Sequence, residues 1–335
     1  MYYKILFYNS LMIGTLIAIS SYSWMSMWIG LEINLLSIIP LMSSTNNMMA
    51  SEASLKYFIT QAMASSLLLF AITLIAMNNL INMNSNLYLA LVLNTALFIK
   101  MGAAPFHFWF PEVSEGLSWK NMIIMLTWQK LAPMVLIMFS ISSFTYMIIM
   151  VISSMAVSGI LGINQTSLRK IMAYSSINHI GWMISSLMLM EVIWLYYFLI
   201  YSLITISIII MLNHLNIFYL NQLFISMNYK YQFKLFFVLN FLSLGGLPPF
   251  LGFFPKWLTI QILVESNLYF IAFLMVLMTL MTLFFYIRIT FSSLLLSSIH
   301  ITYYKQTTTK KFFMTIINYT SIMGLIILTI LFNLI

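Results

Sequence analysis

Long apolar segments separated by short polar breaks run through the whole chain. Apolar segments of about 18 or more residues can cross a ~30 Å hydrocarbon core as helices, whereas an outer-membrane barrel would show alternating segments of about ten residues. The pattern predicts about eleven transmembrane helices. Their expected ranges are 4–22, 24–42, 53–78, 87–109, 121–139, 143–163, 168–189, 192–214, 234–263, 268–292 and 313–334. We therefore expect an all-α membrane protein that forms a single polytopic domain over residues 1–335.

Two of the expected helices are interrupted by glycine and proline, within FIKMGAAPFHFWFPE (98–112) and LGGLPPFLGFFPK (244–256). At one constant offset of 144 residues, the first interruption falls on the second. Proline removes a helical hydrogen bond, and glycine reaches conformations that strain other residues. The expected hinges are Gly102, Pro105, Gly245, Gly246, Pro248 and Pro249. Broken helices at corresponding places in two halves of a membrane protein are typical of an ion or substrate pathway.

The same offset predicts an internal repeat. It maps the fourth expected helix onto the ninth, which gives a first repeat over 1–140 and a second over 141–296, with a loop and last helix in 297–335. Each repeat has about five helices, and this odd number requires the second repeat to be inverted in the membrane. Outside the two interruptions the halves share little sequence, so the prediction of a repeat rests on those segments.

Composition agrees with this class and excludes several others. The 335 residues are 62% hydrophobic and only 6% charged, against roughly 25% charged in a soluble domain. The absence of cysteine excludes disulfides, thiolate metal sites and cysteine-ligated iron–sulfur clusters. The net charge of +8 does not indicate nucleic acid, because the basic residues are scattered among helices and loops.

Basic residues in loops or near helix ends all fall on one side of the expected topology, the side of the N-terminus. They are Lys4, Lys56, Lys120, Arg169, Lys170, Lys230, Lys234, Arg288, Lys305, Lys310 and Lys311. An excess of lysine and arginine marks the negative compartment. We therefore expect the N-terminus to face that compartment and the C-terminus to face the opposite one.

Four other charged residues lie in expected helices and are not assigned to the basic side: Glu32, Lys100, Lys130 and Lys256. An ionised side chain near the bilayer centre costs at least ~2.5–3.5 kcal/mol to insert, so such residues indicate a functional site. The alternative is a buried ion pair that only fixes helix packing. Packing needs one polar pair, whereas a proton pathway needs a series of groups.

Five segments resemble the NADH-ubiquinone oxidoreductase chain 2 family, the antiporter-like membrane subunits of respiratory complex I in animal mitochondria. They are SEASLKYFITQ (51–61), FIKMGAAPFHFWFPEV (98–113), LTWQKLAP (126–133), GINQTSLRKIMAYSSINHIGWM (162–183) and LSLGGLPPFLGFFPKW (242–257). The resemblance implies a proton-translocating core subunit in the membrane arm of the complex. It also implies a location in the mitochondrial inner membrane, with the N-terminus in the matrix and the C-terminus in the intermembrane space.

The resemblance also implies a set of relay residues. Glu32, Lys100, Lys130, Lys256 and His179 match the charged and polar axis of the family. One departure is the expected helix 192–214, which lacks the lysine that larger antiporter-like subunits carry there. A relay would have to continue through bound water or through Tyr196, Tyr197, Tyr201, Ser202 or Thr205, and the sequence does not choose among them.

Redox chemistry is expected on partner chains. The sequence has no GxGxxG fingerprint, P-loop, CxxC motif or histidine pair at haem spacing, so NADH, FMN, iron–sulfur clusters and ubiquinone are expected on other subunits. The resemblance implies neighbouring chains 4 and 4L of the complex, with lipid, cardiolipin above all, around the helices. Alternatives left open are a stand-alone Mrp-type cation/proton antiporter and a structural subunit whose buried charges no longer conduct.

Overall fold

The structure is a computed structural model that describes residues 2–44, 47–81, 86–141, 143–227 and 231–295, together with the positions 318, 319, 324 and 329. Every named element in these residues is an α-helix, and their only β pairing is an isolated bridge between Ser167 and Tyr219. The predicted all-α class is therefore confirmed. The chain divides into two compact units, Met1–Ser154 and Met155–Ile335.

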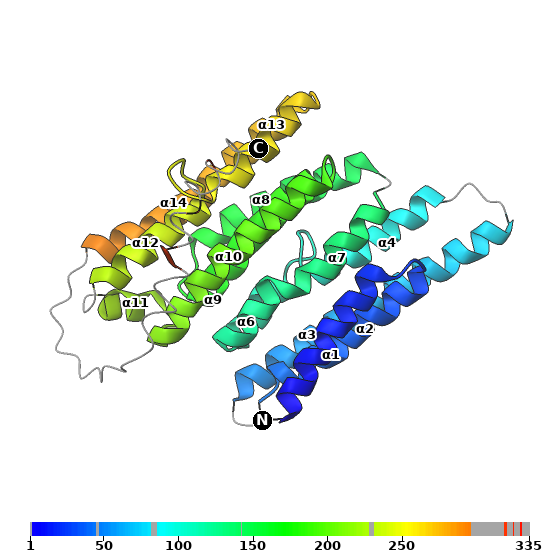
Figure 1. The fold of residues 1–335 in the computed structure, drawn as a ribbon, viewed down its shortest axis with the longest axis horizontal. Helices are drawn as coiled ribbons and strands as arrows, with labels where there is room; N and C mark the ends of the chain where they lie inside the picture. The colour runs from blue at the N-terminus through cyan, green and yellow to red at the C-terminus, as the bar shows by residue number, and fades with distance from the viewer. Residues whose placement is uncertain are drawn as a thin grey trace. The chain divides into compact units, whose positions relative to one another are not determined.

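The first unit is built from seven helices and the start of an eighth. They are α1 (Tyr2–Ser20), α2 (Trp24–Met42), α3 (Met48–Ile81), α4 (Asn86–Met101), α5 (Trp109–Gly116), α6 (Trp119–Leu126), α7 (Trp128–Phe139) and α8 (Phe144–Ile163). Helix α1 packs on α2, α2 packs on α3, and α3 packs on both α4 and α5 (Figure 1). A Cβ atom added to Gly30 would lie 2.6 Å from the backbone nitrogen of Ala18. The close approach of α1 and α2 therefore depends on small residues, as is common between membrane helices.

The second unit contains the remaining helices of the described chain. They are α9 (Leu168–Leu187), α10 (Glu191–Leu215), α11 (Leu220–Met227), α12 (Tyr231–Gly245), α13 (Phe253–Glu265) and α14 (Tyr269–Leu295). Helix α12 packs on α10 and α14 (Figure 1). Helix α9 contacts α10, α13 and α14, and every residue of α9 except Arg169 and Lys170 is buried. This helix is the least apolar of the long helices, so its polar side chains lie inside the protein.

Seven stretches of the described residues are long and apolar enough to cross a membrane: Tyr3–Ser20, Trp24–Met42, Met48–Met77, Trp119–Phe139, Phe144–Ile163, Glu191–Leu215 and Tyr269–Leu295. The expected helices 87–109 and 234–263 are each divided at their interruption, into α4 with α5 and α12 with α13. The expected last helix, 313–334, falls outside the described residues apart from isolated positions. The chain is thus a multi-pass α-helical membrane protein.

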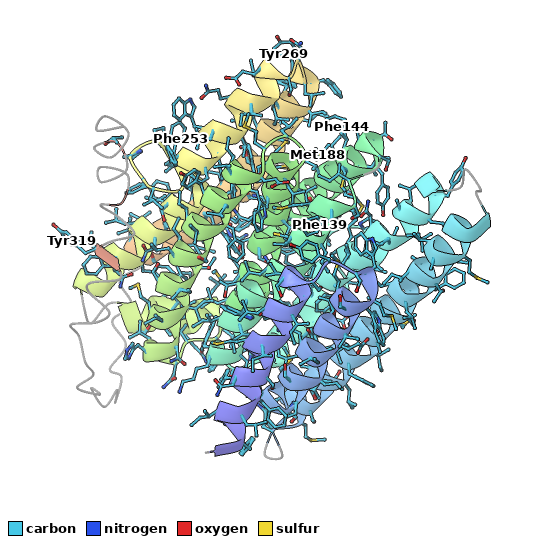
Figure 2. The ribbon with its side chains drawn as sticks, turned by 45° about the vertical axis from the view of Figure 1, so that its right-hand side comes forward. Phe139, Phe144, Met188, Phe253, Tyr269 and Tyr319 are labelled. Atoms are coloured by element: carbon cyan, nitrogen blue, oxygen red, sulfur yellow. The ribbon has the colours of Figure 1, made fainter. Side chains whose placement is uncertain are left out.

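Large apolar side chains are exposed along the outer faces of these helices. Tyr269 projects from the first turn of α14 (Figure 2) and is 59% exposed. Leu16 on α1 is 62% exposed. Contiguous apolar exposure on this scale is disfavoured in water. These faces therefore suit contact with hydrocarbon.

Candidate functional site

The two interrupted helices break and restart at equivalent residues. Helix α4 ends at Met101 and α5 begins at Trp109, while α12 ends at Gly245 and α13 begins at Phe253. Both interruptions are seven residues long and are separated by the same 144 positions that align the sequences. The structure therefore gives both interruptions the same length and position within their helices.

The backbone conformation of the two interruptions also corresponds. Gly102 has φ 74° and Gly246 has φ 79°, in the left-handed region where glycine avoids the Cβ penalty. The next N–H closes the helix end in both cases. That of Ala103 donates to the Phe98 carbonyl at 3.1 Å, and that of Leu247 donates to the Leu242 carbonyl at 3.4 Å. This glycine-centred closure satisfies carbonyls that the end of a helix would otherwise leave unpaired.

Of the other predicted hinge residues, Pro105, Pro248 and Pro249 lie within the interruptions, whereas Gly245 is the last residue of α12. The Ala104–Pro105 peptide bond is cis, and the described residues contain no other cis bond. Proline cannot donate a backbone hydrogen bond, so helical pairing cannot run through either interruption.

Lys100 lies in the last turn of α4 and is buried. Its side chain lines a small cavity of ≈ 10 Å³, about the size that holds one water molecule. The cavity is lined by Leu31, Asn34, Leu35, Tyr57, Gln61, Lys100, Gln129 and Pro133. Uncharged polar side chains therefore surround Lys100 on several sides.

These polar side chains form a hydrogen-bonded chain. Gln129 Nε2 donates to Asn34 Oδ1 at 2.8 Å, and the Tyr57 hydroxyl donates to Gln129 Oε1 at 3.3 Å. Gln61 Nε2 donates to the backbone carbonyl of Lys100 at 3.3 Å. The amides fix the cavity wall while leaving the lysine ammonium beside space for water.

Glu32 lies on α2 and is half-buried. Its charge interacts electrostatically with Lys100. The ion pairs of the described residues, with nitrogen and oxygen within 4.0 Å, do not include this one. Glu32 is therefore a neighbour of Lys100 without being its direct partner.

Lys130 is fully buried at 1% exposed and lies in the first turn of α7. Its Nζ atom is 5.7 Å from the centre of the Phe110 ring in α5. A cation over an aromatic face is stabilised electrostatically. Lys100 precedes the first interruption and Lys130 contacts the helix that follows it, so two lysines flank one break.

Lys256, in the first turn of α13, reaches back across the second interruption. Its Nζ atom donates to the carbonyls of Gly245 at 2.8 Å and Leu244 at 3.3 Å, at the end of α12. The carbonyls at a helix C-terminus lack helical partners and carry the negative end of the helix dipole. The ammonium also lies 5.9 Å from the ring centre of Trp182 on α9. The carbonyls therefore hold the Lys256 side chain across the second interruption.

His179, on the buried helix α9, has its Nδ1 atom 2.9 Å from the hydroxyl of Tyr197 on α10. The centre of its ring lies 4.9 Å from that of Tyr201. Both tyrosines are buried, whereas Tyr196 is 43% exposed. Tyr197, one of the α10 residues that could continue the relay, is therefore hydrogen-bonded directly to His179.

The neutral residues of the site are not predicted from the sequence. Tyr57 and Gln61 are one helical turn apart and face Lys100 from α3, and Gln129 precedes Lys130 in the quoted LTWQKLAP motif. Amide and hydroxyl groups cost little to bury when they bond to each other, so they leave no signal comparable to a buried charge. The described residues bring no three His, Cys, Asp or Glu side chains together as a metal centre.

A multi-pass helical protein with lysines at two equivalently broken helices belongs to the antiporter-like class of membrane proteins. The NADH:quinone oxidoreductase/Mrp antiporter transmembrane family matches residues 21–282. The chain is 51% identical over 333 residues to NADH-ubiquinone oxidoreductase chain 2 of Aedes aegypti, covering 98% of this chain and 97% of that one. It is 41% identical to the same protein of Lemur catta, covering 85% and 83%. The chain therefore belongs to this family and, within it, to the NADH-ubiquinone oxidoreductase chain 2 proteins.

Solved structures share the fold at lower identity. A chain of respiratory complex I from Thermus thermophilus superimposes with a TM-score of 0.85 at 20% identity, over 97% of this chain and 79% of that one. A chain of the Mrp complex from Dietzia gives 0.69 at 17% identity, over 84% and 58%. These solved structures thus share the all-helical fold of this chain.

Proposed function

We propose that this chain is a proton-translocating core subunit of the membrane arm of mitochondrial NADH:ubiquinone oxidoreductase. The observation that carries the proposal is the pair of broken helices, each with a buried lysine, in a chain whose relatives are 41–51% identical chain 2 proteins. A stand-alone Mrp-type antiporter is supported less well. The likeness to the Mrp chain is weaker, and this chain spans only 58% of that chain.

The proposed relay consists of Glu32, Lys100, Lys130, Lys256 and His179. In the first unit, the separation of Glu32 and Lys100 sets how tightly each group holds its proton, because opposite charges stabilise each other. A small movement at the interruption beside Lys100 would change this separation. A change in spacing then becomes the uptake or release of a proton, and a water molecule in the small cavity beside Lys100 could accept that proton.

In the second unit, Lys256 would be charged while it donates to the carbonyls at the end of α12. A movement of α13 that breaks these bonds would favour loss of its proton, because a buried ammonium without acceptors is costly. We propose that the relay continues through His179 and Tyr197. Their hydrogen bond supplies a polar connection on a helix that has no lysine.

The proposal includes the finer topology. It comprises about eleven membrane helices, with inverted repeats over 1–140 and 141–296 and a last segment over 297–335. The equal length of the two interruptions supports the repeats. The one-sided distribution of lysine and arginine supports an N-terminus in the matrix and a C-terminus in the intermembrane space.

The proposal assigns redox chemistry to other subunits. NADH, FMN, iron–sulfur clusters and ubiquinone would be bound there, and this chain would respond to electron transfer through its helices. Chains 4 and 4L are the proposed neighbours, and cardiolipin is the proposed surrounding lipid. The absence of cysteine and of nucleotide-binding motifs supports this division of labour.

The experiment is a Lys100→Met variant in the purified complex, reconstituted into vesicles. We expect the complex to assemble and oxidise NADH while proton uptake per electron falls, because methionine keeps the apolar stem and removes the titratable group. A pH-sensitive dye inside the vesicles measures pumping, and native electrophoresis measures assembly. Lys120→Met is the matched control, since Lys120 is an exposed lysine at the start of α6. Normal pumping by an assembled Lys100→Met complex would contradict the proposal.

A further inference from the structure

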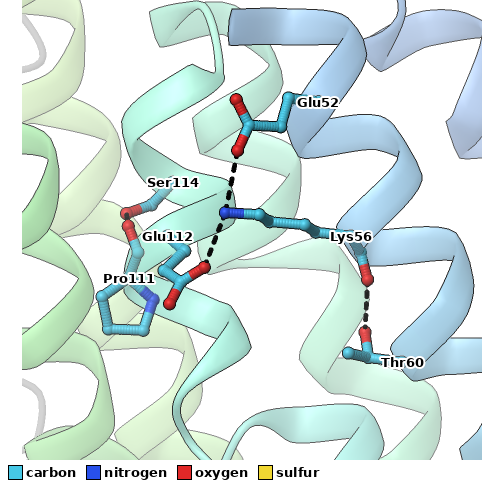
Figure 3. A network of polar contacts seen from close by, with 6 residues as sticks. All are labelled: Glu52, Lys56, Thr60, Pro111, Glu112 and Ser114. Atoms are coloured by element: carbon cyan, nitrogen blue, oxygen red, sulfur yellow. Dashed lines mark hydrogen bonds and ion pairs between the residues drawn. The ribbon is translucent and has the colours of Figure 1, made fainter.

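A three-residue charge cluster lies on the surface of the first unit. Lys56 Nζ is 2.7 Å from Glu112 Oε2 and 3.0 Å from Glu52 Oε1, and all three side chains are partly exposed (Figure 3). Glu52 and Lys56 lie one turn apart on α3, and Glu112 lies in the first turn of α5. The cluster therefore joins α3 to the helix that follows the first interruption.

An apolar groove of ≈ 610 Å³ begins at this cluster. One wall is the α3 stripe formed by Ile59, Met63 and Leu67, which are 55%, 62% and 38% exposed. The other wall is the interruption itself, including Pro105, Phe106 and Phe108, the last 72% exposed. The groove is thus apolar along its length, with charged groups at one end.

The length of the groove corresponds to one leaflet of a bilayer. From Lys56 to Leu67 the helix advances about 16 Å at 1.5 Å per residue, roughly half of a ~30 Å hydrocarbon core. A transmembrane helix of another chain would need a contact surface about twice as long. An acyl chain of a single lipid, with its headgroup at Lys56, has the matching length.

The charge of the cluster selects the headgroup. One lysine against two carboxylates leaves a negative charge in excess. An ammonium group has three N–H donors, and Lys56 directs two of them at Glu52 and Glu112 (Figure 3). The third can donate to a phosphate, while the excess carboxylate can accept hydrogen bonds from a primary amine. A choline headgroup has no N–H to give, and an anionic headgroup would be repelled.

We propose that this groove binds one phosphatidylethanolamine molecule, with its ammonium on Glu112 and Glu52, its phosphate on Lys56 and an acyl chain along Ile59, Met63 and Leu67. This site is separate from the relay. A wall of the groove is the interruption that follows Lys100, so a bound lipid would brace that segment from outside.

Photolabelling of the intact complex tests the proposal. The complex is reconstituted with phosphatidylethanolamine, phosphatidylcholine or cardiolipin, each carrying the same diazirine-labelled acyl chain, and labelled peptides are identified by mass spectrometry. The baseline is the lipid-facing surface of α14 around Phe273 and Phe284, which are 61% and 55% exposed. We expect only the phosphatidylethanolamine probe to label residues 59–67 and Phe108 above this baseline, by roughly fivefold, the size of one charge contact at a membrane surface.

Glu112→Gln should return this labelling to the baseline, while Glu265→Gln, which alters an exposed carboxylate on α13, should leave it unchanged. Equal labelling by the three probes would overturn the proposal. So would labelling at the baseline level, or a crosslink from the groove to another protein chain in place of lipid. The comparison of the three lipids uses the unmodified complex, so it decides the matter even if a variant fails to assemble.

Discussion

The two broken helices have similar backbone conformations at their interruptions but place their lysines in different surroundings. Lys100 lies before its interruption, beside a water-sized cavity walled by neutral amides. Lys256 lies after its interruption and donates to the carbonyls of the helix that precedes it. Similar interruptions therefore place Lys100 beside a water-sized space and Lys256 in hydrogen bonds to the carbonyls at a helix end. We infer that Lys256 combines a structural role with a proton-carrying one.

Replacement of Lys256 should produce the largest effect of any single change at the interruptions. Lys256→Met removes a titratable group and leaves the Gly245 and Leu244 carbonyls without their donor. Hydrogen bonds to charged groups contribute about 1.5–3 kcal/mol, so we expect lost pumping together with lower thermal stability. Lys100→Met should lose pumping with little change in stability. Thermal unfolding of both purified complexes measures the contrast, and equal stability loss in the two variants would remove the distinction.

The second-largest difference between the two interruptions is expected when alanine replaces the positive-φ glycines, Gly102 and Gly246. Placing a Cβ in the left-handed region costs about 1–2 kcal/mol at either Gly102 or Gly246. The new Cβ atom would lie 2.8 Å from the Lys256 side chain at Gly246 and 3.0 Å from the Phe110 side chain at Gly102. Because only the first contact directly displaces a proposed relay lysine, we expect Gly246→Ala to reduce pumping more than Gly102→Ala. Gly245→Ala is the control, because this residue is helical and an added Cβ atom would come no closer than 3.7 Å to another side chain. Proton uptake per electron ranks the three, and an inactive Gly245→Ala would show that the contrast is not specific.

Removal of the Tyr197 hydroxyl should have a moderate effect confined to the second unit. Tyr197→Phe loses the bond to His179, a contribution of about 0.5–1.5 kcal/mol, and interrupts the proposed relay on α10. We expect a several-fold lower pumping rate with unchanged NADH oxidation by the uncoupled complex. Tyr196→Phe, at an exposed position on the same helix, should match the unmodified protein. Full pumping in Tyr197→Phe would show that the relay passes through water or Tyr201 and not through Tyr197.

The smallest effect is expected at the amide chain of the first unit. Gln129→Leu removes the donor to Asn34 and the acceptor for Tyr57, and unsatisfied buried partners cost about 1–3 kcal/mol. Because Lys100 and Glu32 are retained, pumping should persist at a reduced rate. Gln261→Leu, an exposed position on α13, serves as the control. If Gln129→Leu pumped no protons, the amide would be a relay member and not a wall of the cavity.

The sequence predicted the elements of this site better than their contacts. The length of the apolar segments predicted the helices, because a helix must be long enough to cross the hydrocarbon core. Gly102 and Gly246 predicted the helix ends, because a positive φ angle strains other residues. The links between Gln129 and Asn34, or between His179 and Tyr197, could not be predicted. They depend on which faces of different helices pack together.

The equal seven-residue length of the interruptions has a consequence for how the chain can vary. Residues 246–252 are not helical, so an added or deleted residue there would change the spacing and direction between the end of α12 and the start of α13. Lys256 is the fourth residue of α13, and such a change would move it away from the carbonyls at the end of α12. Both length and composition are therefore constrained in this segment. A Cβ atom at Gly252 would overlap the Ser243 carbonyl oxygen, and a single insertion or deletion would displace the lysine.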